Sequence, residues 1–539
     1  MTWYQEAVFY EVYIRAFADG NGDGIGDFIG LTQKLDYLQE LGVTCLWILP
    51  MYPSPLIDDG YDIADYYGIH PDYGTLDDFK AFLEAAHARG MRVIADLVMN
   101  HTSDQHPWFQ SARASRVSPF RDYYVWSDTD QLYKEARIIF IDTQTSNWQW
   151  DAQTQQYYWH RFYPQQPDLN YDQPAVRQAI IDVLHYWASL GLDGFRADAV
   201  PYLFERPGTN CENLPETHAY LKEVRRALST RYPDRILLAE ANQWPQDVRP
   251  YFGDEDEFHM AFHFPVMPRI YMSLAREDYR PIVEIMRATP PIPPSCQWCI
   301  FLRNHDELTL EMVTPEEREF MWNTYAPDPR MRLNLGIRRR LAPLMGGDRR
   351  KILLLNSILF TLPGSPILYY GDELGMGDNI QLPDRNGVRT PMQWDASPNA
   401  GFSSAPVQRL YSPVIDDPIY GYQKVNAAQQ RNDPNSLWSA ICHLIALRKQ
   451  HLVLSYGNLT FVEGPNPACL AYYRGLDEQR ILALHNLSGG TQTFTGTWDG
   501  LQKTILRDLV TGIEFPVSQD GGLNLQLQPY QFLWLSASL

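Results

Sequence analysis

Residues 191–200, GLDGFRADAV, combine the apolar pattern of a buried strand with three charged side chains. Charged groups are almost never fully buried in proteins unless they are paired or used in function. Arg196 and Asp198 lie two residues apart at the end of this segment. We expect Arg196 to hold Asp198 as a carboxylate, whereas we expect a structural or solvent-facing role for Asp193.

Polar side chains also follow three other apolar runs, ADLVMNH, LLAEAN and FLRNHDE. One carboxylate at a strand end is usually a cap or a surface charge. When several carboxylates lie at the same end of a sheet or barrel together with arginine and histidine, a purely structural role does not easily account for them. The side chains that these three runs supply are Asp96, Asn100, His101, Glu240, His305 and Asp306.

Carboxyl groups that share a cleft can cleave glycosidic bonds. Retaining cleavage needs an ionised carboxylate as nucleophile and a protonated carboxyl group as acid, about 5–5.5 Å apart. Burial and mutual repulsion separate the pKa values of two such groups, so that one is charged while the other keeps its proton. Asp198, held as a carboxylate by Arg196, suits the attack on a sugar C1.

The positions of these side chains depend on eight short apolar runs that alternate with helical stretches such as LTQKLDYLQELG and LDDFKAFLEAAHARG. The runs span residues 7–14, 44–49, 92–98, 194–199, 235–240, 259–264, 299–304 and 365–372. This alternation predicts parallel βα units, and closure of eight units gives an α/β fold, the (β/α)8 TIM barrel, with its chemistry at the carboxyl ends of the strands. A doubly wound open sheet fits the same pattern.

Two stretches break the rhythm of the barrel. About 70 residues between the third and fourth strands, 102–173, are too long for a simple loop and predict an inserted domain B. The barrel is assigned to residues 1–101 and 174–454, with a small insertion around 311–350. From about residue 455 short alternating segments predict a C-terminal antiparallel β-sandwich, domain C, at 455–539.

Composition excludes several classes of partner. With 45 Lys and Arg against 65 Asp and Glu, the net charge is −20, so neither nucleic acid nor an anionic membrane surface is an expected partner. The most apolar window, 352–370, is interrupted by polar residues, Gly and Pro and predicts no membrane span. No secretory signal is visible, and six cysteines form no disulfide framework, which together predict a cytoplasmic location.

The segments ADLVMNH, GFRADAV, LLAEAN and FLRNHD resemble the four sequence regions of the α-amylase family, glycoside hydrolase family 13. The resemblance implies that Asp198 is the nucleophile, that Glu240 is the general acid/base, and that Asp306 fixes sugar hydroxyls in the distorted transition state. Ala197 departs from the pattern, where many members carry a larger apolar residue, but it removes no catalytic group. The resemblance also implies sugar-binding roles for His101, Arg196 and His305.

Two further segments resemble the pocket of exo-acting members of this family. In DDGYDIADYY, Asp58 and Tyr61 would hold a terminal glucose. In RNGVRTPMQWD, Arg389 would reach the same hydroxyls as Asp58. A structural ion pair between Asp58 and Arg389 is the alternative. The resemblance implies a closed pocket that accepts single terminal glucose units.

The segments ARIIFIDTQTSNWQWD and AVPYLFERPGTNCENLPETH resemble the branch of the family that isomerises maltose to trehalose by intramolecular glucosyl transfer. The expected substrate is therefore a small disaccharide, with minor hydrolysis to glucose. A hydrolytic α-glucosidase is the alternative. A non-catalytic transporter accessory chain is disfavoured, because all three carboxylates are present. The resemblance leaves open a homo-oligomer and a separate maltose kinase as a partner.

The segment DGNGDGIGD places oxygen ligands at alternate positions, as in the first half of an EF-hand calcium loop. Its twelfth position is Gly30 instead of Glu, so it is not an EF-hand. The α-amylase family carries a calcium loop at this place, and a tight turn without an ion is the alternative. The expected ligands are Asp19, Asn21, Asp23, the carbonyl of Ile25, and Asp27.

The resemblance also suggests a second, structural calcium site that would join domain B to the barrel. Its oxygen ligands come from three segments that the fold would bring together. The expected ligands are Asn100, Asp168, the carbonyls of Tyr202 and Leu203, and Glu205. Neither ion would activate water, because the expected chemistry needs no metal.

Overall fold

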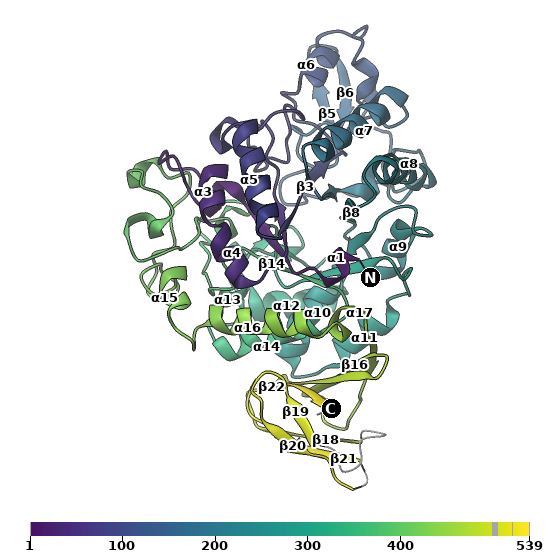
Figure 1. Ribbon diagram of the computed structural model, residues 1–539. Coiled ribbons are helices and arrows are strands. Elements are labelled where there is room, and N and C mark those ends of the chain that lie inside the picture. The colour runs from purple at the N-terminus through teal and green to yellow at the C-terminus, as the bar shows by residue number, and fades with distance from the viewer. Residues whose placement is uncertain (1, 498–504, 520, 538–539) are drawn as a thin grey trace.

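Eight parallel strands close into a barrel within the described residues, 2–497, 505–519 and 521–537, of the computed structural model (Figure 1). The strands are β1 (Phe9–Val12), β2 (Cys45–Ile48), β3 (Arg92–Val98), β7 (Gly194–Asp198), β8 (Ile236–Ala239), β9 (Met260–Phe262), β10 (Gln297–Phe301) and β14 (Ser365–Tyr369). Their order around the barrel is β1-β14-β10-β9-β8-β7-β3-β2, so strands that follow one another in the chain are neighbours. The predicted TIM barrel is therefore confirmed, and the open doubly wound sheet is excluded.

The seventh barrel strand differs in position from its prediction. It was expected at 299–304, whereas β10 spans Gln297–Phe301. The chain leaves the strand earlier because the side-chain oxygen of Asn304 accepts the backbone N–H of Asp306 at 3.2 Å and closes a turn. Asp306, expected directly after the strand, consequently lies further along the loop above the barrel.

Helices cover the outside of the barrel (Figure 1). They include α4 (Leu35–Leu41), α5 (Leu76–Ala88), α7 (Pro174–Ser189), α8 (Pro215–Arg231), α10 (Val266–Arg276), α11 (Arg280–Ala288), α14 (Arg349–Thr361) and α16 (Leu437–Gln450). In α5, a capping box between Thr75 and Asp78 starts the helix. Its buried residues recur at helical spacing and turn one face to the barrel: Phe79, Phe82, Leu83 and Ala86.

The chain between β3 and β7 builds a separate small sheet, at the top of Figure 1. It contains α6 (Pro107–Ala114) and the strands β4 (Trp126–Ser127), β5 (Trp148–Asp151) and β6 (Gln156–Trp159), paired in the order β4-β6-β5. An isolated bridge between His101 and Asp168 joins the start of this segment to its end. The segment therefore leaves the barrel and returns to it at neighbouring points above β3.

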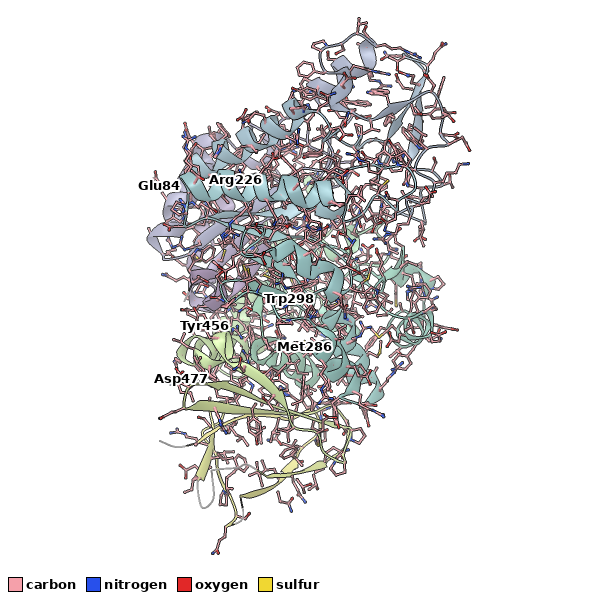
Figure 2. All side chains as sticks on the ribbon, turned by 90° about the vertical axis from the view of Figure 1, so that its right-hand side faces the viewer. Glu84, Arg226, Met286, Trp298, Tyr456 and Asp477 are labelled. Carbon is pink, nitrogen blue, oxygen red and sulfur yellow. The ribbon has the colours of Figure 1, made fainter. Side chains whose placement is uncertain are left out.

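The C-terminal part is antiparallel and lies at the end of the barrel opposite the inserted segment (Figures 1 and 2). Among the described residues, its sheets have the orders β15-β16-β17-β22-β19-β20 and β18-β21. The strands are β15 (Asn458–Phe461), β16 (Cys469–Leu476), β17 (Gln479–Asn486), β18 (Gln492–Thr497), β19 (Ile505–Asp508), β20 (Glu514–Pro516), β21 (Gly522–Leu527) and β22 (Phe532–Ala537). Residues 498–504, 520, 538 and 539 of the predicted domain C lie outside the described residues.

The C-terminal sheet is attached to the barrel by buried polar contacts. Arg474 Nη1 donates a hydrogen bond of 2.7 Å to the carbonyl of Thr361 at the end of α14. Tyr456, labelled near this junction in Figure 2, lies in the short helix α17 (Val453–Tyr456) that precedes the sheet, and it donates a partly buried hydrogen bond of 2.7 Å to Glu6 Oε1. In the part of the chain that the structure describes, no helix has both the length and the apolar character needed to cross a membrane.

Candidate active site

Three carboxyl groups meet at the carboxyl end of the barrel. Asp198 is the last residue of β7, Glu240 directly follows β8, and Asp306 lies in the loop after β10. All three line one cavity. The carboxyl ends of the strands are where TIM barrels carry their catalytic residues. The fold therefore gathers groups that are far apart in the sequence.

Arg196 lies at the centre of these groups and is only 1% exposed. Its Nη1 is 2.6 Å from Asp96 Oδ1 and 2.5 Å from Asp198 Oδ1, and its Nη2 is 2.6 Å from Glu240 Oε1. Asp96 also accepts a hydrogen bond of 2.8 Å from Trp47 Nε1. A buried guanidinium requires such partners, because an unpaired charge in the interior is costly. The expected pair between Arg196 and Asp198 is present.

Asp193 lies before the first residue of β7, away from the cavity. Its carboxylate is 2.7 Å from His87 Nε2 and 2.9 Å from Arg92 Nη1. It also accepts the backbone N–H of Val93 at 2.9 Å. These contacts give it a structural role at the opposite end of the strand from Asp198, as the sequence predicts.

The three carboxyl groups differ in their pKa values. Burial raises the pKa of Asp198 to about 6, although Arg196 opposes the shift. Burial raises the pKa of Glu240 to about 8 against the opposing effect of Arg196, and the neighbouring carboxylates add to the increase. Burial also acts on Asp306, but His305 and two nearby arginines bring its pKa below the usual range. Near pH 7, Asp198 is mainly ionised and Glu240 mainly protonated, as a nucleophile and an acid must be.

One end of the cavity is closed by buried polar groups. Asp58 Oδ1 lies 3.0 Å from Arg385 Nη2, and its Oδ2 accepts a hydrogen bond of 3.0 Å from Gln166 Nε2. Gln166 Nε2 is also 3.2 Å from His101 Nε2. Burial lowers the pKa of His101 to about 3, so its ring is neutral. The sequence pattern does not mark Gln166, although this residue lies two positions before the predicted metal ligand Asp168.

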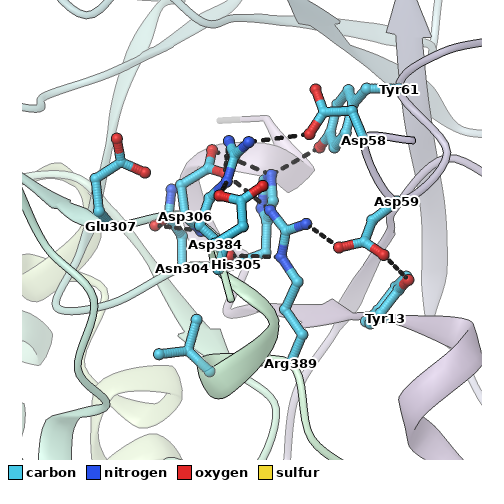
Figure 3. Close-up of polar contacts among 12 residues, drawn as sticks. Tyr13, Asp58, Asp59, Tyr61, Asn304, His305, Asp306, Glu307, Asp384 and Arg389 are labelled. Atoms are coloured by element: carbon cyan, nitrogen blue, oxygen red, sulfur yellow. Dashed lines mark hydrogen bonds and ion pairs between the residues drawn. The ribbon is translucent and has the colours of Figure 1, made fainter. Parts of the chain in front are cut away.

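The same end of the cavity contains the rings of Tyr61 and His305, which the sequence predicts to bind sugar. Tyr61 OH lies 2.9 Å from His305 Nε2, and the two rings stack with their centroids 5.3 Å apart. His305 Nε2 is also 3.2 Å from Asp306 Oδ2 (Figure 3). The structure thus brings together Asp306 and the predicted residues of DDGYDIADYY.

The two arginines of RNGVRTPMQWD take different places. The sequence predicts Arg389 beside Asp58, but the structure places Arg385 there, 3.0 Å from both Asp58 and Asp306. Arg389 pairs with Asp59 and lies 3.0 Å from Asp306 Oδ1 (Figure 3). In the described part of the chain, the cavity is lined by Arg385 and not by Arg389. Both arginines belong to one loop, and the segment alone does not tell which of them faces the cavity.

The other end of the cavity is formed by the inserted segment and by the loops after β7, β8 and β10. Arg137 joins the inserted segment to the loops after β7 and β10, because its guanidinium lies 2.8 Å from Glu212 Oε1 and 2.5 Å from Glu311 Oε2. The lining residues at this end are Ile139, Phe140, Phe162, Tyr202, Asn242, Glu307, Thr309 and Glu311. Among these residues the sequence predicts a site role only for Tyr202, as a metal ligand, because the contacts that build this end join distant segments.

In the predicted calcium loop after β1, backbone N–H groups of the loop donate hydrogen bonds to its own carboxylates. Asp19 accepts the backbone N–H groups of Gly22 at 2.6 Å and Gly24 at 2.8 Å. Asp27 caps α3 (Phe28–Gln33) by accepting the N–H of Gly30 at 2.6 Å. Asn21, Asp23 and Ile25 lie between these two residues in the same loop. The donor set of carboxylate, amide and carbonyl oxygens has the chemistry that calcium prefers.

The second set of predicted ligands contains buried oxygens without partners. Asn100 Oδ1, Asp168 Oδ2 and Glu205 Oε1 are buried and have no hydrogen-bond partner among the described residues. Burial raises the pKa of Asp168 to about 8 and the pKa of Glu205 well above its usual value, and each carboxyl is near the other. Tyr202 and Leu203 lie on the turn that leads to Glu205. Three orphaned acceptors from three segments fit a bound cation.

Comparison with known proteins adds to this geometry. The catalytic-domain model of α-amylase matches residues 11–323 and 338–457, and the C-terminal-domain model of maltogenic amylase matches 459–534. Trehalose synthase of Pimelobacter sp. (strain R48) is 55% identical, over 99% of this chain and 95% of the relative. Trehalose synthase/amylase TreS of Mycobacterium tuberculosis (strain ATCC 25618 / H37Rv) is 55% identical, over 99% of this chain and 90% of the relative.

Solved structures of similar fold include a trehalulose synthase and an α-glucosyl transfer enzyme. A mutant of the trehalulose synthase MutB, in complex with Tris, has a TM-score of 0.82 at 32% identity and covers 100% of both chains. An α-glucosyl transfer enzyme, XgtA, has a TM-score of 0.83 at 28% identity. The chain belongs to the α-amylase family and, within it, to the trehalose synthases.

Proposed function

We propose that this protein isomerises maltose to trehalose by moving one glucosyl group within the active site. The observation that carries the proposal is that Asp198 and Glu240 both contact Arg196 and face one cavity closed at one end, with pKa values of about 6 and about 8. The name of the relatives at 55% identity, trehalose synthase, gives the substrate class. The closed end, formed by Asp58 and Arg385, suits a single terminal glucose and not the interior of a polymer.

In the first half of the reaction, an Asp198 oxygen attacks C1 of the terminal glucosyl group. The bond from C1 to O4 of the second glucose breaks, and its electron pair stays on O4. Glu240 donates its proton to O4, which releases glucose and leaves a glucosyl ester on Asp198. Arg196 neutralises the carboxylates throughout, because it contacts both of these residues.

In the second half, the released glucose remains in the cavity and presents its 1-hydroxyl instead of its 4-hydroxyl. Glu240, now a carboxylate, removes the proton of this hydroxyl as its oxygen attacks C1 of the ester. The bond from C1 to Asp198 breaks, and its electron pair returns to the carboxylate. Two displacements at C1 restore the α configuration, and the product is trehalose.

The fate of the ester depends on the walls of the cavity. Ile139, Phe140 and Phe162 form an apolar wall that excludes water, while Asn242 and Glu307 offer polar contacts to the released glucose. If water reaches the ester instead, the same catalytic groups hydrolyse maltose to two glucose molecules. Hydrolysis is therefore the expected minor reaction, and an α-glucosidase is the competing function.

The deciding experiment is to incubate the purified protein with maltose alone and to follow the anomeric protons by NMR. We expect trehalose as the main product with little free glucose, and no reaction in the Asp198→Asn variant. Accumulation of glucose without trehalose would assign a hydrolytic α-glucosidase. Such a result would keep the roles of Asp198 and Glu240 and remove the isomerase function.

We propose calcium as a structural ion at both predicted metal sites. The orphaned oxygens of Asn100, Asp168 and Glu205 support the second site, because a buried carboxylate needs a partner and a hard cation supplies one. The alternating oxygen donors between Asp19 and Asp27 support the first site. When bound, the ions would hold loops in place, whereas the glucosyl transfer is carried by the carboxyl groups alone.

We also propose a cytoplasmic location. All six cysteines are free, and five of them are buried. Proteins of oxidising compartments more often pair their cysteines in disulfides. Separation of cell fractions with antibody detection of this chain tests the proposal, and recovery in the extracellular fraction would contradict it.

A further inference from the structure

A buried carboxyl group that the proposed mechanism does not use lies next to the closed end of the cavity. Glu11, in β1, is 0% exposed. Its Oε1 accepts the backbone N–H of His305 at 3.2 Å and lies 2.5 Å from Nδ1 of the same residue. Its other oxygen, Oε2, is buried and has no hydrogen-bond partner among the described residues. The hydrogen bonds that Glu11 makes through its side chain therefore go to one residue only.

The other nitrogen of the His305 ring faces the site of reaction. Its Nε2 lies 2.9 Å from Tyr61 OH and 3.2 Å from Asp306 Oδ2. One face of the ring stacks on Tyr61, and the ring meets Trp47 at an angle of 81°. Packing therefore limits the plane of the ring, but it does not by itself decide which nitrogen carries the proton. The hydrogen bond at one ring nitrogen sets the state of the other.

We propose that Glu11 is a positioning residue that acts on the substrate through His305. It accepts the Nδ1–H of His305, fixes the orientation of the ring, and thereby keeps Nε2 directed at the glucosyl group beside Tyr61 and Asp306. Glu11 itself does not line the cavity among the described residues. The identity of the glucosyl substrate rests on the proposed function, whereas the contact between Glu11 and His305 does not.

The contacts to His305 require a side chain of a particular length at position 11. One oxygen must reach both the backbone N–H and Nδ1 of His305. The amide oxygen of glutamine can take this place, because glutamine has the same length and also accepts hydrogen bonds. Aspartate keeps the carboxylate but is one methylene group shorter, so its oxygen is withdrawn from the ring. Position of the acceptor, and not charge, is therefore the property under test.

The test compares Glu11→Gln with Glu11→Asp, using 4-nitrophenyl α-glucoside and maltose as separate substrates. We expect E11Q to keep most of the wild-type kcat/KM, and E11D to lose about 10- to 100-fold, a loss of the size found for outer partners of metal-bound histidines. An E11D variant that is as active as E11Q, or more active, would overturn the proposal. The nitrophenyl substrate reports glucosyl transfer to Asp198 whether or not trehalose forms, so failure of the isomerase function is seen separately with maltose.

A double-mutant cycle separates positioning from general stability. In a His305→Asn background, the ring that Glu11 holds is absent, so E11D should cost little further activity on the nitrophenyl substrate. An equal loss in the His305→Asn and wild-type backgrounds would show that Glu11 acts by another route. Circular dichroism of each variant, recorded under assay conditions, confirms that folded enzyme is compared.

Glu373 provides a matched control for a buried carboxyl group with a purely structural role. It is also 0% exposed, and its Oε1 accepts hydrogen bonds of 2.7 Å from the hydroxyls of Tyr10 and Tyr37. Its Oε2 is likewise buried without a partner among the described residues. We expect Glu373→Asp to lower the melting temperature and to leave KM and kcat unchanged. A kinetic loss in E373D as large as that in E11D would contradict the specific role of Glu11.

Discussion

One guanidinium group contacts three carboxyl groups at the centre of the site. Arg196 reaches Asp96, Asp198 and Glu240 from a single buried position. Burial raises the pKa of both Asp198 and Glu240, and the positive charge of Arg196 opposes the rise in each. Asp198 and Asp306 add to the rise at Glu240, so its pKa of about 8 keeps it protonated near neutral pH, where Asp198 is ionised. The assignment of nucleophile and acid therefore follows from the surroundings of two chemically similar groups.

The pH dependence of kcat/KM should reflect these two groups. Below the pKa of Asp198, about 6, the nucleophile takes up a proton and loses its reactivity. Above the pKa of Glu240, about 8, the acid loses the proton that it must donate. We therefore expect a bell-shaped profile with its maximum between these values, measured as initial rates of trehalose formation from maltose. A rate that rises steadily through pH 9 would contradict the role of Glu240. The two limbs belong to the coupled pair and not to either residue alone.

Substitution of the two carboxyl groups should have effects that depend on the leaving group. Glu240→Gln should slow the reaction of maltose by about 10²–10⁴, the usual contribution of an acid catalyst. It should slow α-glucosyl fluoride much less in the first step, because fluoride leaves without a proton. Asp198→Asn should abolish the reaction of both substrates. Stopped-flow measurement of fluoride release distinguishes the two variants, and equal losses on both substrates in Glu240→Gln would argue against the acid role.

Arg385 should contribute to binding of the terminal glucose, whereas surface arginines such as Arg330 should not. Arg385→Ala removes contacts to Asp58 and Asp306 and leaves both carboxylates without this partner. We expect kcat/KM for maltose to fall by about 10- to 100-fold, corresponding to about 1.4–2.8 kcal/mol. The control is Arg330→Ala, because Arg330 pairs with Asp328 at the surface and such exposed pairs contribute little. Unchanged kinetics in Arg385→Ala would remove this residue from the site.

The elements of the barrel could be predicted from the sequence, whereas several contacts between its loops could not. Buried parallel strands leave a local signal, because each is a short apolar run between helical stretches. Asp198 and Glu240 were found because they directly end such runs. Gln166 and Glu311 left no such signal, because each meets its partner across loops from distant parts of the chain. The place of Arg385 was missed because the choice between two arginines of one loop depends on the path of its backbone.

The loops around the proposed second metal site provide a prediction about ion removal. Chelation of calcium should lower the melting temperature, since calcium at 100 times its Kd raises the free energy of unfolding by about 2.7 kcal/mol. Asp168→Ala should reduce this response, because it removes one of the oxygens that face the proposed ion. Differential scanning calorimetry with and without a calcium chelator measures both effects. Identical melting curves with calcium and with chelator would contradict a structural ion at either site.

At the scale of the whole molecule, the C-terminal sheets and the barrel share a buried junction far from the cavity. Trp534 of β22 is 0% exposed and donates a hydrogen bond of 2.8 Å to Ser357 Oγ in α14. His485 of β17 meets the same hydroxyl at 2.9 Å. The inserted segment, by contrast, contacts the barrel at the site of reaction. One attachment therefore serves stability, and the other serves chemistry.

Trp534→Ala should destabilise the protein without changing its chemistry. Truncation of a buried tryptophan costs about 3–5 kcal/mol, and here it also removes the hydrogen bond to Ser357. We expect a lower melting temperature but wild-type KM and kcat at temperatures well below unfolding. Trp150→Ala is the control, because Trp150 is 45% exposed on the inserted segment and should change stability by less than about 0.5 kcal/mol. Loss of activity in folded Trp534→Ala would show that the junction influences the cavity.

The wall formed by Ile139 and Phe140 belongs to the inserted segment, and Arg137 fastens that segment to the barrel. The catalytic carboxyl groups, by contrast, are carried by the barrel itself. The inserted segment should therefore influence the fate of the glucosyl ester more than the carboxyl groups of the barrel do. We expect heat or mild denaturant that loosens the wall to admit water to the ester, so that the proportion of glucose in the product rises while maltose is still consumed. The purity of the trehalose is thus a more sensitive gauge of this protein's integrity than its turnover.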